Sequence, residues 1–346
     1  MCGAAAPGPT GGDHTTTEAG AHPPAVVAVV ASAGGVEALS EFVSLLPADF
    51  PAAVLVLLHI PPAGPSVLPR ILGRAGKLPA HHPKDGELLA GGVITVAPPD
   101  RHLVVADGQV RLLTDARENG HRPSADVLLR SVAQDFGARG AGIVLSGSMD
   151  DGAAGLRALR VANGFALVQD PKQAAFPGMP QAAIDEADPQ FVGRVSALTE
   201  RLCTWLARLP DDPEEADPPE PVPAPKSPTP LTCPECGGTL FDHDVFGAER
   251  LRCRVGHTFS LDGLALGKQE VVEKALWAAV VALDEQADLS RRIMARLSAS
   301  GRTSQLARYR EDIAVIEQRA SVLLGLIHEL VERASISDEE EASDDD

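Results

Sequence analysis

The chain has 346 residues, of which 44% are hydrophobic, and a formal net charge of −18. This length allows two or more domains with a sizeable apolar core. The acidic charge is concentrated in the runs 211–220 and 337–346, so the rest of the chain is near neutral and offers no basic surface for nucleic acid.

The sequence carries no signal for a membrane or for export. No apolar run approaches the roughly 18 residues that a membrane-spanning helix requires. The N-terminus lacks a charged segment followed by an apolar one. Of the five cysteines, three cluster between positions 233 and 253, unlike a secreted disulfide framework. We therefore expect a cytoplasmic protein without membrane insertion.

The stretch 26–39 is a candidate nucleophile turn. An apolar, β-branched run over 26–31 predicts a buried parallel strand, followed by Ser32, Gly34 and Gly35 and then by a helical pattern. A serine there would lie at the carboxyl end of a sheet, beside the free N–H groups of a helix N-terminus. That geometry suits a nucleophile next to an oxyanion hole. Taken alone, a serine that only caps the helix is the simpler interpretation, and a dinucleotide loop is disfavoured because G-x-G-x-x-G is absent.

Two further strand ends bring a histidine and carboxylates to the same edge. The strand predicted over 53–58 ends at His59 and completes a βαβ unit, although a purely structural histidine is equally compatible. The strand predicted over 141–145 leads to Asp150 and Asp151, either of which could cap the next helix. A serine needs an imidazole to take its proton, and the imidazole needs a carboxylate to hold its tautomer. The three strand ends therefore supply a candidate triad.

The remaining patterns complete one doubly wound, mostly parallel α/β domain over 25–209. They predict a strand over 93–96, a β-hairpin that turns at Asp107-Gly108, a helix capped by Ser124 and running to about 136, a helix over 153–161, a strand over 165–169, and helices over 181–184 and 198–209. His81 and His82 fall in a polar loop and are interpreted as solvated.

Five motifs of this domain occur together in one order. They are A-S-A-G-G at 31–35, L-H-I-P at 58–61, R-P-S-A-D at 122–126, L-S-G-S-M-D-D-G-A at 145–153, and Q-D-P at 169–171 with G-M-P at 178–180. Together they resemble the catalytic domain of CheB-type chemotaxis methylesterases over about 25–209. The resemblance implies a domain that hydrolyses the methyl esters of receptor glutamates without a catalytic cofactor, with deamidation of protein glutamine as a candidate second activity.

The resemblance also implies roles for individual residues. Ser32 aligns with the nucleophile, His59 with the general base and Asp151 with the orienting carboxylate, since the family's acid directly precedes the glycine. The backbone N–H groups near Ala33 and Ser148 then hold the oxyanion.

Three features depart from the family pattern. Ala33 stands where the family has a threonine. In the loop 147–152, the family reads G-M-G-N-D-G and this chain reads G-S-M-D-D-G, so that Ser148 replaces a methionine and Asp150 an asparagine. A backbone donor survives a change of side chain, so we expect the oxyanion hole to persist, whereas the charge of Asp150 could raise the pKa of Asp151 or of the imidazole.

The third departure is the missing N-terminal receiver. Residues 1–24 have a composition typical of disorder, so we expect no control by aspartyl phosphorylation within this chain.

An acidic, proline-rich linker is predicted over 210–230, and a zinc-ribbon-like module over 231–261. A C-x₂-C pair and a C-x₃-H pair, sixteen residues apart, suit tetrahedral Zn²⁺; the four candidate ligands are Cys233, Cys236, Cys253 and His257. A module this short cannot build a core unaided, so we expect a structural metal. Four protein ligands leave no open position, which argues against catalytic zinc. Unliganded thiols, a redox role for the first cysteine pair and His243 as a competing ligand are weaker alternatives.

Residues 262–335 predict an antiparallel helical hairpin, and residues 336–346 an acidic disordered tail. Apolar residues follow a heptad-like pattern on either side of a break at Ser300-Gly301. The first seam consists of Leu276, Val280, Leu283, Ala287, Met294 and Leu297, and the second of Leu306, Tyr309, Ile313, Ile316, Ala320, Leu323, Ile327 and Leu330. We interpret the hairpin as a docking or dimerisation device that packs on the ribbon or on another copy.

Two functions follow from the sequence. The first is a serine hydrolase that demethylates a chemoreceptor or another methylated signalling protein and releases methanol. The alternative is a catalytically weak, esterase-like scaffold that binds signalling partners through its zinc ribbon and helical hairpin. The intact Ser32, His59 and Asp151 favour the first function.

Overall fold

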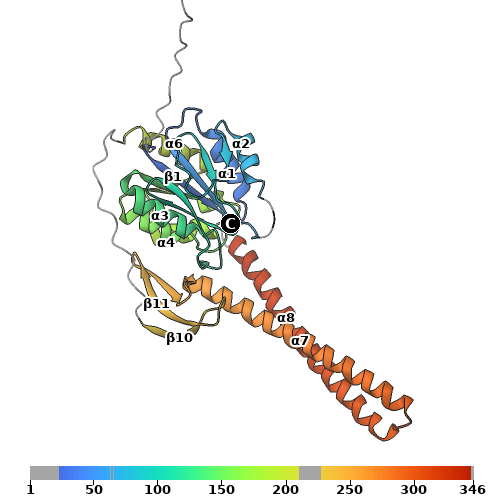
Figure 1. The fold of residues 1–346 in the computed structure, drawn as a ribbon. Helices are drawn as coiled ribbons and strands as arrows, with labels where there is room; N and C mark the ends of the chain where they lie inside the picture. The colour runs from blue at the N-terminus through green and yellow to red at the C-terminus, as the bar shows by residue number, and fades with distance from the viewer. Residues whose placement is uncertain (1–22, 63, 65, 210–226, 344–346) are drawn as a thin grey trace, which may run out of the picture.

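A seven-stranded sheet, in which every neighbouring pair is parallel, forms the centre of the first domain (Figure 1). The computed structural model describes residues 23–209, except 63 and 65, and residues 227–343. The strand order is β3-β4-β2-β1-β7-β8-β9. The strands are β1 (Val26–Ala31), β2 (Ala53–Leu58), β3 (Ala80–His81), β4 (Ile94–Val96), β7 (Gly140–Val144), β8 (Phe165–Gln169) and β9 (Phe191–Gly193). The chain runs outward in both directions from β1, so the switch point of the sheet lies between β1 and β7.

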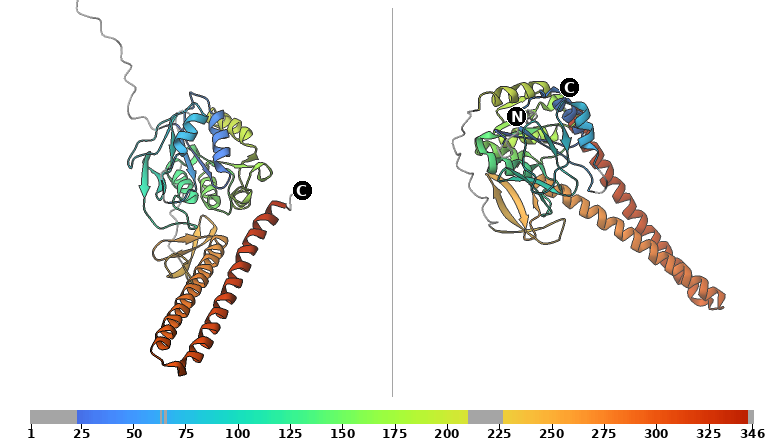
Figure 2. Two further views of the ribbon diagram at one scale, coloured as in Figure 1. Left: turned by 90° about the vertical axis from the view of Figure 1, so that its right-hand side faces the viewer. Right: turned by 45° about the horizontal axis from the view of Figure 1, so that its top comes forward.

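Helices cover both faces of this sheet (Figures 1 and 2). They are α1 (Gly35–Leu45), α2 (Leu68–Ala75), α3 (Ala125–Phe136), α4 (Ala153–Val161), α5 (Gly178–Ala187) and α6 (Val195–Leu206). In β1, Val26, Ala28 and Val30 face one apolar core, with α3, α4 and α5, and the alternate residues face the other, with α1, α2 and α6. Because both faces are buried, the strand is apolar throughout. The predicted doubly wound fold is confirmed, as is its β-hairpin, formed by β5 (His102–Ala106) and β6 (Gln109–Leu113).

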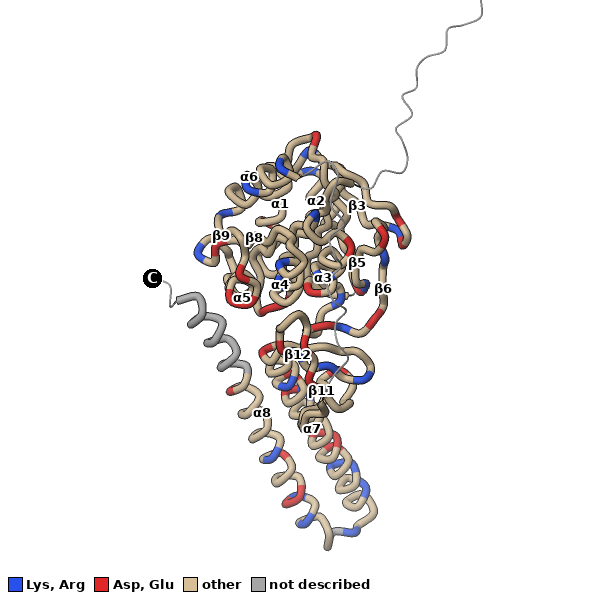
Figure 3. The backbone as a smooth tube through the Cα atoms, turned by 90° about the vertical axis from the view of Figure 1, so that its left-hand side faces the viewer, with Lys and Arg blue, Asp and Glu red and all other residues tan. Residues whose placement is uncertain are grey.

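The second part of the chain consists of a small antiparallel sheet and two long helices (Figure 2). The sheet contains β10 (Pro228–Thr232), β11 (Thr239–Val245), β12 (Ala248–Cys253) and β13 (Thr258–Phe259), and the helices are α7 (Leu261–Ala299) and α8 (Leu306–Ser343). All predicted seam residues of both helices are buried or half-buried. Figure 3 shows acidic and basic residues interspersed along both helices, as suits the solvated face of a hairpin.

Several predicted boundaries differ from the structure. The linker was expected to extend to 230, but β10 begins at Pro228 and pairs with β11, because antiparallel pairing overrides the local proline content. The acidic tail was expected from 336, but α8 continues to Ser343. Helices α5 and α6 begin three residues before their predicted starts, and α6 ends three residues early. Residues 1–22, most of the linker and 344–346 lie outside the described residues.

The two histidines expected in solvent are also placed differently. Both are half-buried; His81 bonds to Glu87 at 2.5 Å, and His82 Nδ1 lies 2.9 Å from the carbonyl oxygen of Val96.

Within the described residues, none of the helices combines the length and apolar character that crossing a bilayer would require.

Candidate active site and metal cluster

The sheet register brings Ser32 and His59 to neighbouring strand ends. Ala31 of β1 pairs with Leu58 of β2, and each candidate residue directly follows its strand. The N–H of His59 donates to the Ala31 carbonyl at 3.1 Å, and the N–H of Ser32 donates to the Ser146 carbonyl, beyond β7, at 2.9 Å. Ser32 therefore lies at the switch point, between the two strand ends that carry the other members of the candidate triad.

The imidazole of His59 contacts the carboxylate of Asp151 directly. His59 Nε2 lies 2.7 Å from Asp151 Oδ2, and the two side chains are 8% and 2% exposed. Because Asp151 is ionised, Nε2 carries the proton that makes this bond, and Nδ1 keeps a free lone pair. The ring can therefore accept a proton at Nδ1 while the carboxylate stabilises the resulting imidazolium.

The carboxylate of Asp151 also caps helix α3. It accepts hydrogen bonds from the N–H groups of Ala125 at 2.7 Å and Asp126 at 3.1 Å, and from the hydroxyl of Ser124 at 2.8 Å. Burial alone would raise the pKa of Asp151, but the hydrogen bond from His59, the charges of both nearby imidazoles and the Ala125 N–H hold it well below its usual range. The predicted cap at Ser124 is confirmed, since its side chain accepts from the Val127 N–H.

Asp126 makes the reciprocal contact to helix α4. Its Oδ1 accepts from the N–H groups of Gly152 at 3.0 Å and Gly155 at 2.7 Å. The two aspartates thus cap each other's helices across the site. Burial, and after it the charge of Asp151, raise the pKa of Asp126 to about 8.

The structure corrects the predicted roles of Asp150. Its side chain does not cap α4, which begins after Gly152 at a φ of 108°, and Asp126 supplies the capping oxygen instead. Burial raises the pKa of Asp150, and Ser260 and Arg250 from the second part of the chain oppose that shift. The net shift of the Asp151 pKa is downward, because the hydrogen bond from His59 and the charges and donors around it outweigh burial and the repulsion expected from Asp150.

The residues predicted as oxyanion donors flank the serine. A Cβ placed on Gly147, next to Ser148, would lie 2.9 Å from the Ser32 Cβ, so the 147–148 backbone passes directly beside the nucleophile position. The Ala33 carbonyl accepts from the Ser146 hydroxyl at 2.8 Å, which ties the two loops together. Within the described part of the chain, neither the Ala33 N–H nor the Ser148 N–H has an acceptor, so both remain available.

A cavity of about 280 Å³ opens beside His59. Its lining consists of His59, Ile60, Pro61, Pro62, Arg117, Gly120, His121 and Arg122. The guanidinium of Arg122 is held by Asp100 Oδ1 at 2.6 Å, whereas Arg117 Nη1 lies 3.8 Å from Glu235 Oε1.

Sequence reasoning missed His121, whose ring stacks on that of His59. The ring centroids lie 4.0 Å apart and the planes are 6° from parallel. Burial, followed by the charge of His59, lowers the pKa of His121 to about 4, so this imidazole is neutral at neutral pH. The available signal was the preceding Asn-Gly pair, which marks a tight two-residue turn.

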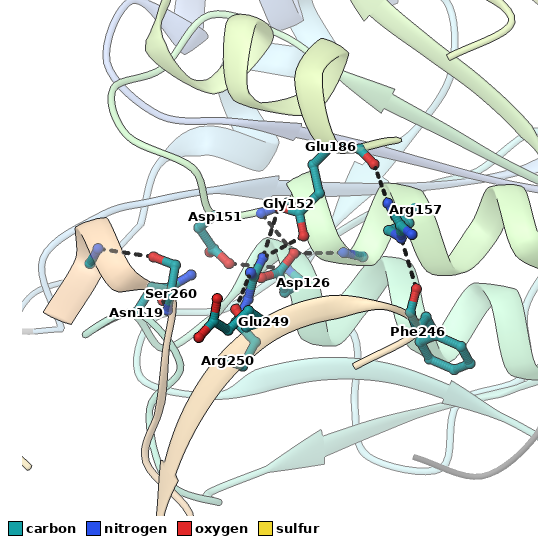
Figure 4. Close-up of polar contacts among 12 residues, drawn as sticks. Asn119, Asp126, Asp151, Gly152, Arg157, Glu186, Phe246, Glu249, Arg250 and Ser260 are labelled. Carbon is teal, nitrogen blue, oxygen red and sulfur yellow. Dashed lines mark hydrogen bonds and ion pairs between the residues drawn. The ribbon is translucent and has the colours of Figure 1, made fainter. Parts of the chain in front are cut away.

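The second part of the chain packs against this edge of the first domain (Figure 4). Arg250 of β12 bonds both carboxylate oxygens of Glu186, at 3.0 and 3.1 Å, and its side chain is 7% exposed. Burial raises the pKa of Asp126 and of Asp150, and the positive charge of Arg250 offsets part of that rise. Arg157 of α4 donates to the Phe246 carbonyl at 2.7 Å. The second module therefore contributes to the electrostatics beneath the candidate triad.

The four predicted metal ligands come together in the small sheet. The potential ligand atoms of Cys233, Cys236, Cys253 and His257 all lie within 4.8 Å of one another. His257 Nδ1 is 3.6 Å from Cys233 Sγ and 3.5 Å from Cys253 Sγ, and the sulfurs of Cys236 and Cys253 are 3.7 Å apart. Tetrahedral zinc, with bonds of about 2.0–2.3 Å, places its ligand atoms roughly 3.5–3.8 Å apart. The donor set and its spacing fit zinc.

The surroundings of the cluster agree with this fit. Gly237 and Gly256 have φ of 71° and 112°, which permits the tight turns after Cys236 and before His257. Among the described residues, His243 is not part of the cluster; it lies buried on β11. The alternative in which it competes as a ligand is therefore disfavoured.

A parallel α/β sheet with a serine, a histidine and an aspartate at its carboxyl edge is the arrangement of an α/β serine hydrolase. The chain belongs to the CheB methylesterase family, whose model matches residues 27–202. The resemblance of the five motifs is thereby confirmed.

Individual relatives match the same domain. The chain is 45% identical over 185 residues to protein-glutamate methylesterase/protein-glutamine glutaminase 3 of Anaeromyxobacter dehalogenans, a match that covers 53% of this chain and 54% of the relative. It is 41% identical over 180 residues to protein 4 of the same name from Myxococcus xanthus, covering 52% and 51%. The chain thus spans about half the length of these curated relatives.

A solved structure matches as well. The catalytic domain of the Thermotoga maritima CheB methylesterase superposes with a TM-score of 0.50 at 27% sequence identity. The match covers 52% of this chain and 97% of that domain. The first domain of this chain therefore has the fold of that catalytic domain.

The raised pKa of Asp126 makes stability depend on pH. Between its ordinary pKa of 3.8 and about 8, the folded protein keeps a proton on Asp126 that the unfolded chain has released. The folded state then binds more protons, so this group lowers the free energy of unfolding as the pH rises. Asp126→Asn keeps an oxygen for Gly152 and Gly155 but does not titrate. Relative to wild type, it should gain stability between about pH 5 and pH 8.

Urea unfolding at both pH values measures this difference. Asp49→Asn, at an exposed carboxylate after α1, serves as the matched control and should follow the wild type. Parallel pH dependence of Asp126→Asn and wild type would contradict the assignment.

Proposed function

We propose that this chain is a protein-glutamate methylesterase that acts on a methylated chemoreceptor or another methylated signalling protein. The observation that carries the proposal is the buried contact between His59 Nε2 and Asp151, at 2.7 Å, beside the strand end that bears Ser32. This contact leaves His59 Nδ1 free for proton transfer. The names of the relatives support both demethylation and glutamine deamidation as activities.

In the proposed reaction, Ser32 Oγ attacks the ester carbonyl while His59 takes its proton. The N–H groups of Ala33 and Ser148 hold the negative oxygen of the tetrahedral intermediate. The intermediate collapses as His59 returns the proton to the methoxy group, which leaves as methanol. Water then attacks the acyl-enzyme, again with His59 as the base, and releases the glutamate carboxylate. A glutamine side chain would follow the same course and release ammonia.

No step of this reaction requires a cofactor. The Cys233, Cys236, Cys253 and His257 cluster would hold zinc in a structural role, because all four tetrahedral positions are taken by protein ligands. The ion would stabilise the small sheet, whose apolar core is formed by few side chains. Reduced cysteine ligands and an intracellular signalling substrate both fit a cytoplasmic location.

The alternative is a scaffold that has lost esterase activity. Asp150 and Ser148 stand in the triad loop where the family pattern has an asparagine and a methionine, and these changes favour the scaffold. The intact contact between His59 and Asp151 argues against it.

Methanol release from a methylated chemoreceptor tests the esterase. Ser32→Ala and His59→Gln should each lower the rate by about 10³-fold or more, because they remove the nucleophile or its base. Ser44→Ala, at an exposed hydroxyl of α1 that donates to the Glu41 carbonyl of the same helix, should keep wild-type activity. Wild-type rates in the Ser32 and His59 variants would exclude the triad. A folded, inactive wild type that a fluorophosphonate fails to label at Ser32 would support the scaffold.

Metal analysis tests the cluster. The purified chain should contain about one zinc ion, and Cys253→Ser should lose it together with the protection of β11 and β12 against amide exchange. Cys203→Ser, at the half-buried free cysteine of α6, should keep both. Full protection of β11 and β12 without metal would contradict a structural role.

We also propose that the helical hairpin associates two copies of this chain. Apolar side chains remain exposed outside the seam, among them Trp277 at 46%, Val281 at 54% and Val322 at 60%. Burying them between two hairpins would remove apolar surface from water. Sedimentation should show a dimer that Val281→Asp with Val322→Asp dissociates, whereas a wild-type monomer at all concentrations would reject this proposal.

A further inference from the structure

A tight turn carries His121 to the face of His59. The N–H of His121 donates to the Glu118 carbonyl at 2.8 Å, and the N–H of Glu118 donates back to the His121 carbonyl at 3.3 Å. Asn119 and Gly120, the two residues between them, have φ of 47° and 75°, as in a type I′ turn. The turn directs the next residue, His121, against the His59 ring, at a centroid distance of 4.0 Å.

The second module holds this turn from outside the first domain. The N–H of Asn119 donates to the Thr258 carbonyl at 2.8 Å, and the Thr258 N–H donates to the Arg117 carbonyl at 3.3 Å. In return, the N–H of Ser260 donates to Asn119 Oδ1 at 2.8 Å, a contact at the edge of the interface in Figure 4. Asn119, Thr258 and Ser260 are 9%, 5% and 4% exposed, so water does not compete for these bonds.

We propose that Asn119 is a positioning residue for the esterase reaction, through which Thr258 and Ser260 of the second module hold His121 against the catalytic imidazole. This inference rests on the proposed function and specifies how its base is oriented. His59 must keep Nε2 on Asp151 so that, in the proposed reaction, Nδ1 can take the serine proton, and a rotation of the ring about its bond to Cβ would break the contact with Asp151. A parallel ring stacked at 4.0 Å opposes that rotation.

The chemistry of His121 fits this role. Its pKa is lowered to about 4, so the ring remains neutral at neutral pH. A neutral ring does not repel the imidazolium that forms on His59 during the reaction, and its π face favours a neighbouring cation. A small misalignment of a base lowers the rate without removing any group that takes part in the chemistry.

Three variants separate the Asn119 side chain from the turn itself. Asn119→Gly keeps the positive φ but removes the acceptor for Ser260, and Asn119→Asp keeps both. Ser260→Pro removes the donor from the other side of the interface, at a φ of −68° that proline adopts, together with the hydroxyl that caps α7; Ser260→Ala, which loses the same hydroxyl but keeps the N–H, is its control and should keep the ring shift. Asn163→Gly is the matched control, because Asn163 also has a positive φ, 60°, but is exposed at the end of α4.

The experiment observes the histidine rings directly, in the full-length, zinc-loaded chain labelled with ¹⁵N-histidine. Spectra of His59→Gln and His121→Gln assign the two rings. In wild type and in Asn119→Asp, each ring should show the upfield shift of a stacked partner. Asn119→Gly and Ser260→Pro should both lose this shift and should lower kcat for methanol release about three- to tenfold, the effect of one hydrogen bond.

The ring spectra decide the inference even if the chain releases no methanol, in which case only the proposed function fails. Ring shifts in Asn119→Gly and Ser260→Pro that match those of Asn163→Gly would overturn it. The inference would also be overturned if Asn119→Gly and Asn119→Asp both lost the ring shift, because the acceptor oxygen at position 119 would then not be what holds the His121 ring. The zinc content of each variant shows whether the module itself has remained folded.

Discussion

The buried carboxylate of Asp151 joins the imidazole of His59 to the first turn of helix α3. One oxygen bonds His59 at 2.7 Å and the Ala125 N–H at 2.7 Å, and the other bonds the Ser124 hydroxyl and the Asp126 N–H. Charge on an isolated carboxylate this deeply buried would be costly, so its ionisation depends on all these donors together. The start of helix α3 and the orientation of the imidazole are therefore parts of a single hydrogen-bonded unit.

A second consequence is that several carboxyl groups are buried together at the site, and not all of them can be ionised at once. Asp126 and Asp150 lie in the same region, and burial raises the pKa of both. The nearest compensating cation from the second module is Arg250, whose guanidinium is also bound to Glu186. The aspartate at 150, where the family pattern has an uncharged asparagine, thus occurs together with a module that brings a positive charge to it. The electrostatics of this triad belong to both parts of the chain.

The sequence predicted best what depends on neighbouring strands and on local spacing. Ser32 and His59 could be proposed because parallel strand ends meet at a switch point, whereas the choice of Asp151 over Asp150 needed the resemblance to the family. The metal cluster could be found from two short cysteine and histidine pairs. The roles of Asp126 and Arg250 could not be found, because they arise from packing between separate elements: Asp126 caps a helix 26 residues further along the chain, and Arg250 bonds Glu186, 64 residues before it. The pairing of β10 likewise depends on β11 rather than on the proline-rich composition of its own segment.

The segment 257–260 connects the metal cluster, the first domain and helix α7. Within four residues it contains the candidate ligand His257, the interface residue Thr258, and Ser260, which bonds Asn119 and also caps α7 by accepting from the Gly263 N–H. Movement of this short segment cannot be confined to one of these contacts, because two residues separate the metal ligand from the helix cap. The order of the metal cluster, the direction in which the hairpin leaves the sheet, and the position of the His121 turn therefore share one backbone, which makes the second module a structural part of the candidate active site.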